Sequence, residues 1–166
     1  MSAPLHLTLR VASETVALPV APLREILDGA VITRVPGAPA AFRGLMNLRG
    51  TVVPVVDLGV VLGLRAAAAA EPHCLVVLDE RSGAEHTVLA LAADALGEIG
   101  DLAPSAEGVP GFGTRVPAAL VCGLAPREGG FVPVIDVEQV LAFLAGRTAA
   151  MGAAAVDGGA RAGSQP

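Results

Sequence analysis

The sequence predicts a mainly β protein made of two small β-barrels with short helices. This expectation rests on a nineteen-residue segment that occurs twice, on apolar patterns typical of strands, and on an aliphatic composition. The chain has 166 residues, of which 53% are hydrophobic and 2% aromatic. A chain of this length forms one compact domain or two small ones, and its core must consist mainly of Val, Leu, Ile and Ala.

The internal repeat is the most informative feature. Gly44–Leu62 (GLMNLRGTVVPVVDLGVVL) aligns without gaps with Gly123–Leu141 (GLAPREGGFVPVIDVEQVL), 79 residues later, and nine of the nineteen positions are identical. A shorter match lies upstream, where LREI at Leu23–Ile26 corresponds to LGEI at Leu96–Ile99. Two copies of one unit predict two similar subdomains. Two barrels that share apolar faces would leave no strand edge exposed.

Strand patterns occur along most of the chain. Leu5–Val11 alternates apolar with polar residues, as a half-buried strand does. The pair Arg49-Gly50 separates two apolar runs and predicts the turn of a hairpin. Further strands are expected over residues 15–18, 31–35, 45–48, 51–56, 74–78 and 87–91. An Ala-rich linker over 66–70 and a Pro/Gly-rich loop over 103–117 interrupt them.

Several residues of the repeat are expected to build the fold. Proline has no N–H for a strand ladder, so both copies should place it at an edge, a bend or a bulge. The aspartate that follows is expected to cap a helix. Val137, Val140, Leu141 and Leu144 then have the spacing of an amphipathic helix. The expected structural residues are Gly50, Pro54, Asp57, Gly63, Pro133 and Asp136.

The sequence offers little for chemistry. No phosphate-binding loop, serine-hydrolase or zinc-protease motif occurs, and no cofactor or metal is expected. His6, His73 and His86 are widely spaced and are interpreted as surface or turn residues rather than ligands. Cys74 and Cys122 are interpreted as small buried apolar residues.

The net charge and the length of the apolar stretches argue against nucleic acid and the membrane as partners. The net charge is -5 and no basic stripe is present, which argues against binding of nucleic acid. The longest nearly apolar stretch, Thr51–Leu64, is too short for a membrane span, so no membrane insertion is expected.

The remaining signal lies where the two copies of the repeat differ. Asn47 and Arg49 correspond to Pro126 and Glu128, and residues that differ between copies can serve different functions. Arg suits recognition or a fixed ion pair because it carries five donors in a planar group. Glu25 is a candidate partner. Arg49 therefore either recognises another protein or pins its hairpin to its own domain.

The residues also resemble a known family. ETVALPVAPLREI and ITRVPGAPAAFRGLMNLRGTVVPVVDLGVVLGL look like the CheW family of chemotaxis coupling proteins, and the resemblance extends from about Leu5 to Leu144. Its most specific part is the spaced NLRG, P, DL and LG series within Gly44–Leu64. LALAADALGEI at Leu89–Ile99 agrees more loosely, with Asp94 kept.

This resemblance implies a fold of two intertwined five-stranded SH3-like barrels. Residues 1–147 would form a single CheW-like domain, with subdomains at about 15–65 and 73–145 that exchange strands at their ends. Residues 148–166 are expected to be a disordered tail, because they are rich in Ala, Gly and Ser and lack an apolar period.

The resemblance also implies a function. The protein would be a non-catalytic adaptor that joins the cytoplasmic tip of a chemoreceptor to the regulatory domain of a CheA-type histidine kinase. It would be cytoplasmic and recruited to membrane receptor arrays. The positions that match the family's receptor-contacting region are Leu23, Glu25, Gly44, Asn47 and Arg49. Two alternatives remain: a small-molecule-binding or enzymatic β-barrel, and the same adaptor in a non-flagellar chemosensory pathway.

Overall fold

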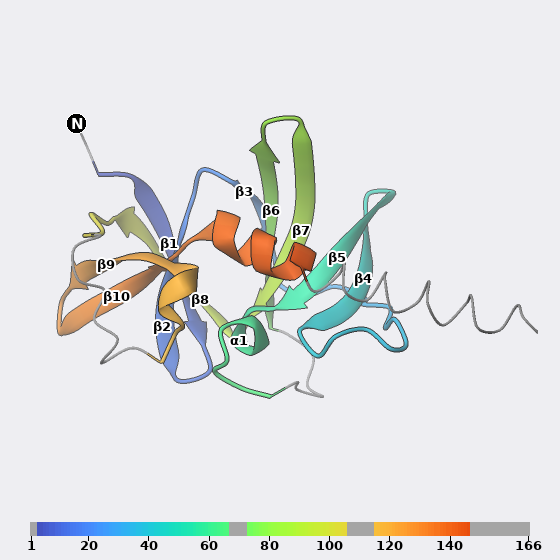
Figure 1. The fold of residues 1–166 in the computed structure, drawn as a ribbon, viewed down its shortest axis with the longest axis horizontal. Helices are drawn as coiled ribbons and strands as arrows, with labels where there is room; N and C mark the ends of the chain where they lie inside the picture. The colour runs from blue at the N-terminus through green and yellow to red at the C-terminus, as the bar shows by residue number, and fades with distance from the viewer. Residues whose placement is uncertain (1–2, 67–72, 106–114, 147–166) are drawn as a thin grey trace, which may run out of the picture.

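The computed structural model describes residues 3–66, 73–105 and 115–146 (Figure 1). The expected tail over 148–166 and most of the Ala-rich and Pro/Gly-rich segments lie outside these residues. The strands are β1 Leu5–Val11, β2 Glu14–Pro19, β3 Leu23–Leu27, β4 Phe42–Leu48, β5 Thr51–Asp57, β6 Cys74–Ser82, β7 Glu85–Ala93, β8 Ala95–Asp101, β9 Val121–Arg127 and β10 Gly130–Ile135. The helices are α1 Leu58–Val61, the short 3₁₀ helix Ala118–Leu120, and a helix over 137–146.

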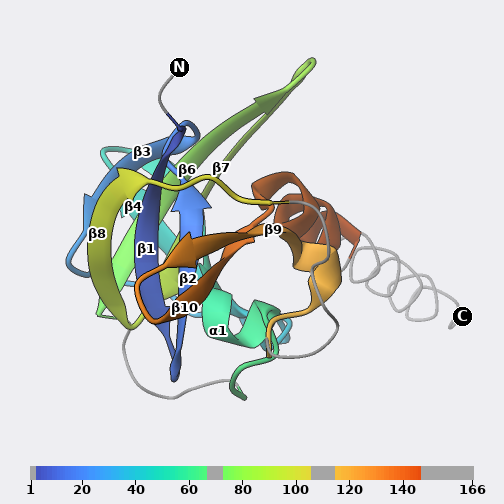
Figure 2. The same cartoon turned by 90° about the vertical axis from the view of Figure 1, so that its left-hand side faces the viewer.

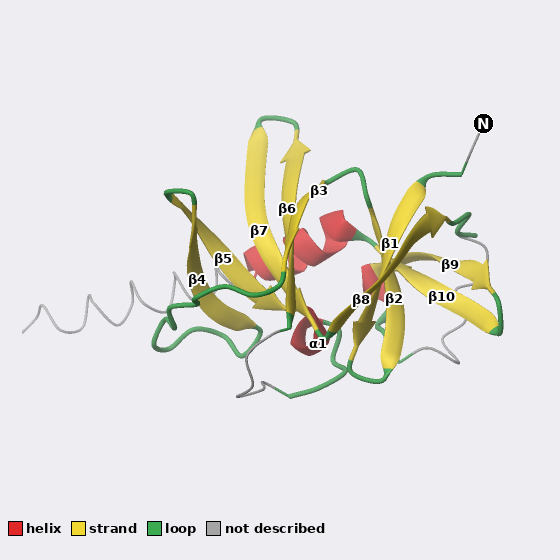
Figure 3. Cartoon of the chain, turned by 180° about the vertical axis from the view of Figure 1, so that it is seen from behind, coloured by secondary structure: helices red, strands yellow, loops and turns green. Residues whose placement is uncertain are grey.

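The strands form two five-stranded sheets, which confirms the mainly β prediction. One sheet has the order β8-β1-β2-β10-β9, and the other has the order β3-β6-β7-β5-β4. Figure 2 shows the first sheet towards the viewer, and Figure 3 shows the two sheets side by side from behind. The helix 137–146 crosses between the sheets on the side seen in Figure 1.

The two sheets exchange hairpins. The chain consists of two units, β1–β5 and β6–β10, and each unit gives its first two strands to one sheet and its last three to the other. The sheets therefore do not coincide with the ranges 15–65 and 73–145, because β2 pairs with β10 while β7 pairs with β5. Both of these exchange contacts are parallel and occupy matching positions, Val134 opposite Ala17 and Val55 opposite Ala90. Each sheet therefore contains strands from both units of the chain.

Among the described residues, continuous strand pairing does not close either five-stranded sheet into a complete barrel. A single bridge joins the two ends of each sheet instead. Thr33, which follows β3, pairs with Leu45 of β4, and Ser105, which follows β8, pairs with Leu124 of β9. Leu45 and Leu124 are equivalent positions of the repeat. Both sheets thus curl until their two end strands meet at this bridge. The line along which the end strands of a sheet meet is called its seam.

Two end strands, β3 and β8, were not predicted as strands. All seven residues of β8 are half-buried or exposed, and no residue of β3 is fully buried, so neither strand shows the alternation by which a strand is recognised. The strand expected over 31–35 was also wrong: only the bridge at Thr33 forms, and Val31 is 89% exposed. The prolines around it, Pro36 and Pro39, fit the irregular path.

The helices and prolines of the repeat follow the predicted pattern. Val137 and Val140 are buried, and Leu141 and Leu144 pack against the same core. Pro54 and Pro133 lie in inner strands, but at positions where only one neighbour is paired. The nitrogen of each proline, which carries no hydrogen, therefore lies where no neighbouring strand needs a hydrogen-bond donor.

Three polar side chains in the core need partners. His6 is 3% exposed within β1, so the expectation of a surface or turn position was wrong for this histidine; its Nδ1 lies 2.9 Å from the carbonyl oxygen of Pro4. Thr8 donates to the Glu98 carbonyl and accepts from the Glu98 amide. Asp57 is 1% exposed and forms a larger network.

A buried ion-pair network links the two sheets. Asp57 accepts hydrogen bonds from the amides of Gly59 and Val60 at the start of α1. It also accepts from Arg65, at 2.9 Å from Nη2, and from Arg43, at 3.3 Å from Nη1. Arg65 donates in addition to Asp94.

Asp94 carries the link into the other sheet. Its second oxygen accepts from the Ala12 amide at 2.6 Å, in the turn between β1 and β2. Partial burial by itself would raise the pKa of Asp94. The hydrogen bonds from Arg65 and from the Ala12 amide have a larger effect in the opposite direction, so the pKa of Asp94 lies below its ordinary value. Burial lowers the pKa of Arg65, but the two carboxylates raise it more. The network therefore fixes the orientation of one sheet relative to the other.

Candidate functional site

The candidate site lies along the seam between β3 and the β4–β5 hairpin. Glu25 projects from β3, and Arg49 occupies the hairpin turn. Their side chains form a bidentate pair, with Nη1–Oε1 at 2.9 Å and Nη2–Oε2 at 2.7 Å. Arg49 is 67% exposed at its side chain and Glu25 20%. The pair thus joins the two ends of one sheet while leaving most of the guanidinium open to solvent.

The turn itself holds Arg49 in place. Arg49 has φ 50° and Gly50 has φ 86°, the left-handed conformations that a two-residue hairpin turn of this kind requires. Gly50 adopts this conformation without strain, whereas Arg49 adopts it at a steric cost. The Asn47 side-chain oxygen accepts from the Gly50 amide at 2.8 Å. Asn47 therefore stabilises the turn that presents the arginine.

Gly44 has a steric function at the same seam. A Cβ atom there would lie 2.2 Å from the carbonyl oxygen of Thr33, and its φ is 141°. At Gly123, the equivalent residue in the other sheet, a Cβ atom would likewise lie 2.9 Å from the carbonyl oxygen of Ser105. Only glycine lets the bridging strand come this close. This explains why both copies of the repeat retain a glycine.

The second sheet lacks the ion pair. Glu98 and Glu128 occupy the positions equivalent to Glu25 and Arg49, and these two acidic groups cannot form an ion pair with each other. The two seams share a backbone design but differ in charge. The surface with Glu25 and Arg49 is therefore specific to one half of the molecule.

The remaining candidate, Leu23, begins β3 and is half-buried against the main core. Four of the five candidate positions, Glu25, Gly44, Asn47 and Arg49, lie along one seam, and Leu23 adjoins it on β3. Of the expected structural residues, Asp57 caps α1 and Asp136 accepts from the Gln139 amide at 3.1 Å. Gly63, with φ 70°, ends the turn after α1.

Metal-ligand groups and membrane-spanning helices are both absent from the described residues. No group of three His, Cys, Asp or Glu side chains among them is placed to hold a metal ion. Within the same ranges, no helix is long and apolar enough to cross a membrane. Cys74 is buried as expected, whereas Cys122 is exposed, contrary to expectation.

Comparison with known proteins decides the family. The model of the CheW-like domain matches residues 5–144. The chain belongs to the CheW-like family. It is 27% identical over 139 residues to the chemotaxis protein CheW of Rhizobium meliloti (strain 1021), which covers 81% of this chain and 84% of the relative. It is also 23% identical over 136 residues to chemotaxis protein CheW of Klebsiella aerogenes, with 81% and 80% covered.

A solved structure shares the fold. The scaffolding protein TtCheW of Thermoanaerobacter tengcongensis superimposes with a TM-score of 0.68 at 24% identity, over 82% of this chain and 85% of that chain. This structural likeness shows the fold. Membership of the CheW-like family makes the chain a non-catalytic scaffolding protein of chemotaxis signalling, which works within a signalling complex. The enzymatic alternative is set aside.

Sequence reasoning missed the residues that join the two sheets. Arg43, Arg65 and Asp94 were not expected to form a network with Asp57. A signal for Arg65 was present, because the equivalent position of the second unit, 79 residues later, is Leu144. The criterion that singled out Arg49, a charged residue at a position where the units differ, also applies to Arg65.

Proposed function

We propose that this CheW-like chain joins the cytoplasmic tip of a chemoreceptor to the regulatory domain of a CheA-type histidine kinase, at receptor arrays on the cytoplasmic side of the membrane. The receptor tip would bind along the seam formed by β3 and the β4–β5 hairpin. The observation that supports this assignment is the bidentate Glu25–Arg49 pair, which is mostly open to solvent at Arg49 and has no counterpart in the other sheet.

Arg49 has a positioning function in this proposal, and Glu25 is the group that contacts the receptor. Glu25 accepts two hydrogen bonds from Arg49, which hold its carboxylate in one orientation. Leu23 adds apolar contact area beside it. Asn47 and Gly44 support the surface through the turn and the bridge.

The kinase domain would bind a different surface. Phe131 lies near the tip of the β9–β10 hairpin, in the sheet opposite the receptor seam, and is 70% exposed. An exposed aromatic side chain of this kind is typical of the centre of a protein interface. Because the two surfaces lie on different sheets, receptor and kinase can bind at the same time and influence each other through linked affinities.

A charge swap tests the receptor surface. Arg49→Glu leaves two carboxylates facing each other and should abolish capture of a purified receptor cytoplasmic fragment. The double variant Glu25→Arg/Arg49→Glu restores an ion pair but exchanges the two groups. It should fold normally and still fail to bind the receptor, because the recognising carboxylate has moved. Restored binding would show that only the presence of the pair matters.

A second variant tests the division of surfaces. Phe131→Ser should weaken capture of the kinase regulatory domain and leave receptor capture unchanged. Val52→Ser is the matched control, since Val52 occupies the equivalent position of the other hairpin and is 66% exposed. If wild-type protein captures neither partner at any salt concentration or with any nucleotide, the proposed function fails.

A further inference from the structure

A groove separate from the receptor seam lies between the helix 137–146 and the β3-β6-β7-β5-β4 sheet. It has a volume of about 620 Å³. In Figure 2, β3 and this helix lie on opposite sides of β6 and β7, and Figures 1 and 3 agree. The helix that lines the groove therefore lies on the other side of β6 and β7 from β3, the strand that carries Glu25.

The groove has an apolar floor. Phe42, Val56 and Leu89 contribute from the sheet, and Leu141 and Leu144 from the helix. All five belong to the main core or pack against it, so the floor is held in place by packing on its inner side. One wall is the β3-β6-β7-β5-β4 sheet, and the other is the helix that follows β10.

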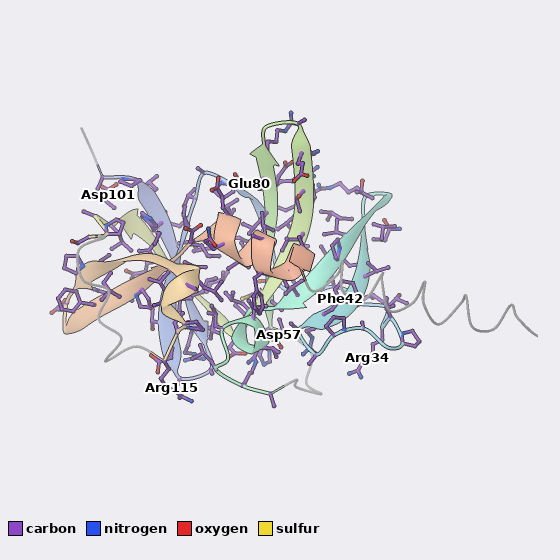
Figure 4. The ribbon with its side chains drawn as sticks, in the orientation of Figure 1. Arg34, Phe42, Asp57, Glu80, Asp101 and Arg115 are labelled. Carbon is purple, nitrogen blue, oxygen red and sulfur yellow. The ribbon has the colours of Figure 1, made fainter. Side chains whose placement is uncertain are left out.

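The rim of the groove is acidic. Glu80 and Glu85 stand on the β6–β7 hairpin, and Glu138 stands on the first turn of the helix. Figure 4 labels Glu80 and Phe42 near opposite ends of the helix. Within the described residues none of the three glutamate side chains has an ion pair or a hydrogen bond, and no basic residue lines the groove. Three carboxylates without partners around an apolar floor favour a cationic, amphipathic occupant.

We propose that this groove binds an amphipathic helical segment of a partner protein, with an apolar face towards the floor and Lys or Arg residues beside it. This surface is additional to the receptor and kinase surfaces of the proposed function. An apolar floor with flanking charges is the arrangement by which grooves accept amphipathic helices. Thr87 is the only neutral polar side chain in the lining, so the groove lacks the convergent polar groups that orient a small-molecule ligand.

Charge argues against a second copy of this chain as the occupant. The chain carries a net charge of -5, so two copies repel each other, and the rim would add three more like charges to the contact. A basic partner gains from the same field, both in affinity and in rate of encounter. A helix bound there would contact the β3-β6-β7-β5-β4 sheet on one side and the helix 137–146 on the other.

The probe for the test is a synthetic helical peptide with Leu at positions i, i+3, i+4 and i+7 and Lys elsewhere, labelled with fluorescein. Binding to the full chain is measured by fluorescence anisotropy, and the location by amide chemical shifts. Binding should shift Thr87, Leu89 and Ala142 and leave the Glu25 seam unchanged. The triple variant Glu80→Gln/Glu85→Gln/Glu138→Gln should bind about tenfold more weakly, since each exposed ion pair contributes a fraction of the total.

Matched controls make each outcome decisive. The variant Glu14→Gln/Glu98→Gln/Glu128→Gln removes the same charge outside the groove and should bind as wild type does. A peptide with Glu in place of Lys should not bind. The proposal is overturned if the wild-type chain does not bind the Lys peptide, if the two triple variants weaken binding equally, or if the shifts fall on the seam.

Other occupants of the groove give different results. Self-association of the free chain that the groove variant abolishes would make a second copy the occupant. Nuclear Overhauser contacts from residues 147–166 to Leu89 would make that segment the occupant. Either result overturns the proposal while leaving receptor and kinase capture, and so the proposed function, unaffected.

Discussion

Replacing Asp57 by Ala should destabilise the domain far more than replacing Asp136, although both aspartates occupy the same position of the repeat. Asp57 caps α1 and also neutralises Arg43 and Arg65, whose side chains are 10% and 23% exposed. Loss of a helix cap costs about 1 kcal/mol, and removal of one partner from a buried ion pair costs about 3–5 kcal/mol. We expect a loss of about 4 kcal/mol for Asp57→Ala.

Asp136 provides the matched control. Its side chain accepts one hydrogen bond, from the Gln139 amide, and has no ion pair among the described residues. Asp136→Ala should therefore cost only the cap, about 1 kcal/mol. The milder variant Asp57→Asn keeps an oxygen for the α1 amides and removes the charge. Its loss of stability should therefore fall between those of Asp57→Ala and Asp136→Ala.

Urea unfolding followed by circular dichroism measures the difference. With a slope of about 2 kcal/mol per molar urea for a domain of this size, Asp57→Ala should lower the midpoint by about 2 M and Asp136→Ala by about 0.5 M. Equal midpoints for the two variants would refute the reasoning, because the cap would then be the whole contribution of Asp57.

Three further predictions concern single sites. Gly44→Ala should cost more stability than Gly123→Ala, because its Cβ approaches the bridging carbonyl more closely and its φ is 141°; thermal melting of the two variants compares them. The pKa of Asp94 is lowered in the folded state, so its contribution is complete above the unfolded value of about 4 and is lost as the pH falls through the folded pKa. Asp94→Asn should therefore be less stable than wild type at pH 7, with the difference narrowing below pH ~4; a denaturation series from pH 7 to pH 2 that shows a constant difference would contradict this. In a thiol assay the exposed Cys122 should react in the native chain, slowly at neutral pH because partial burial of its thiol raises its pKa, and the buried Cys74 should react only on unfolding; equal rates for the two thiols in the native chain would contradict the assignment.

The repeat and the strand patterns determined much of the fold in advance. The duplicated segment predicted two similar units, and the Arg49-Gly50 pair predicted the hairpin turn between β4 and β5. The helix over 137–146 follows the apolar spacing that predicted it. These features depend on residues that are close in sequence, so a local pattern is enough to reveal them.

The sequence alone did not reveal the end strands or the seams. β3 and β8 are held by pairing to β6 and β1, and their residues carry no alternating pattern of their own. The bridges at Thr33 and Ser105 depend on how far each sheet curls. Pairing partners that lie far along the chain are chosen by packing of the whole sheet, which local propensity does not encode.

The candidate site shows the same division. Divergence between the two copies pointed to Arg49 and suggested Glu25, but whether the two side chains meet depends on the curl that brings β3 beside the β4–β5 turn. The Asp57–Arg65–Asp94 link was not predicted, since it joins side chains 8 and 29 residues apart along the chain. The sequence by itself determined which elements form and that they form twice. Only the tertiary structure decided how the hairpins are exchanged and which charges meet, because those contacts form between segments that approach each other only when both sheets have packed around the shared core.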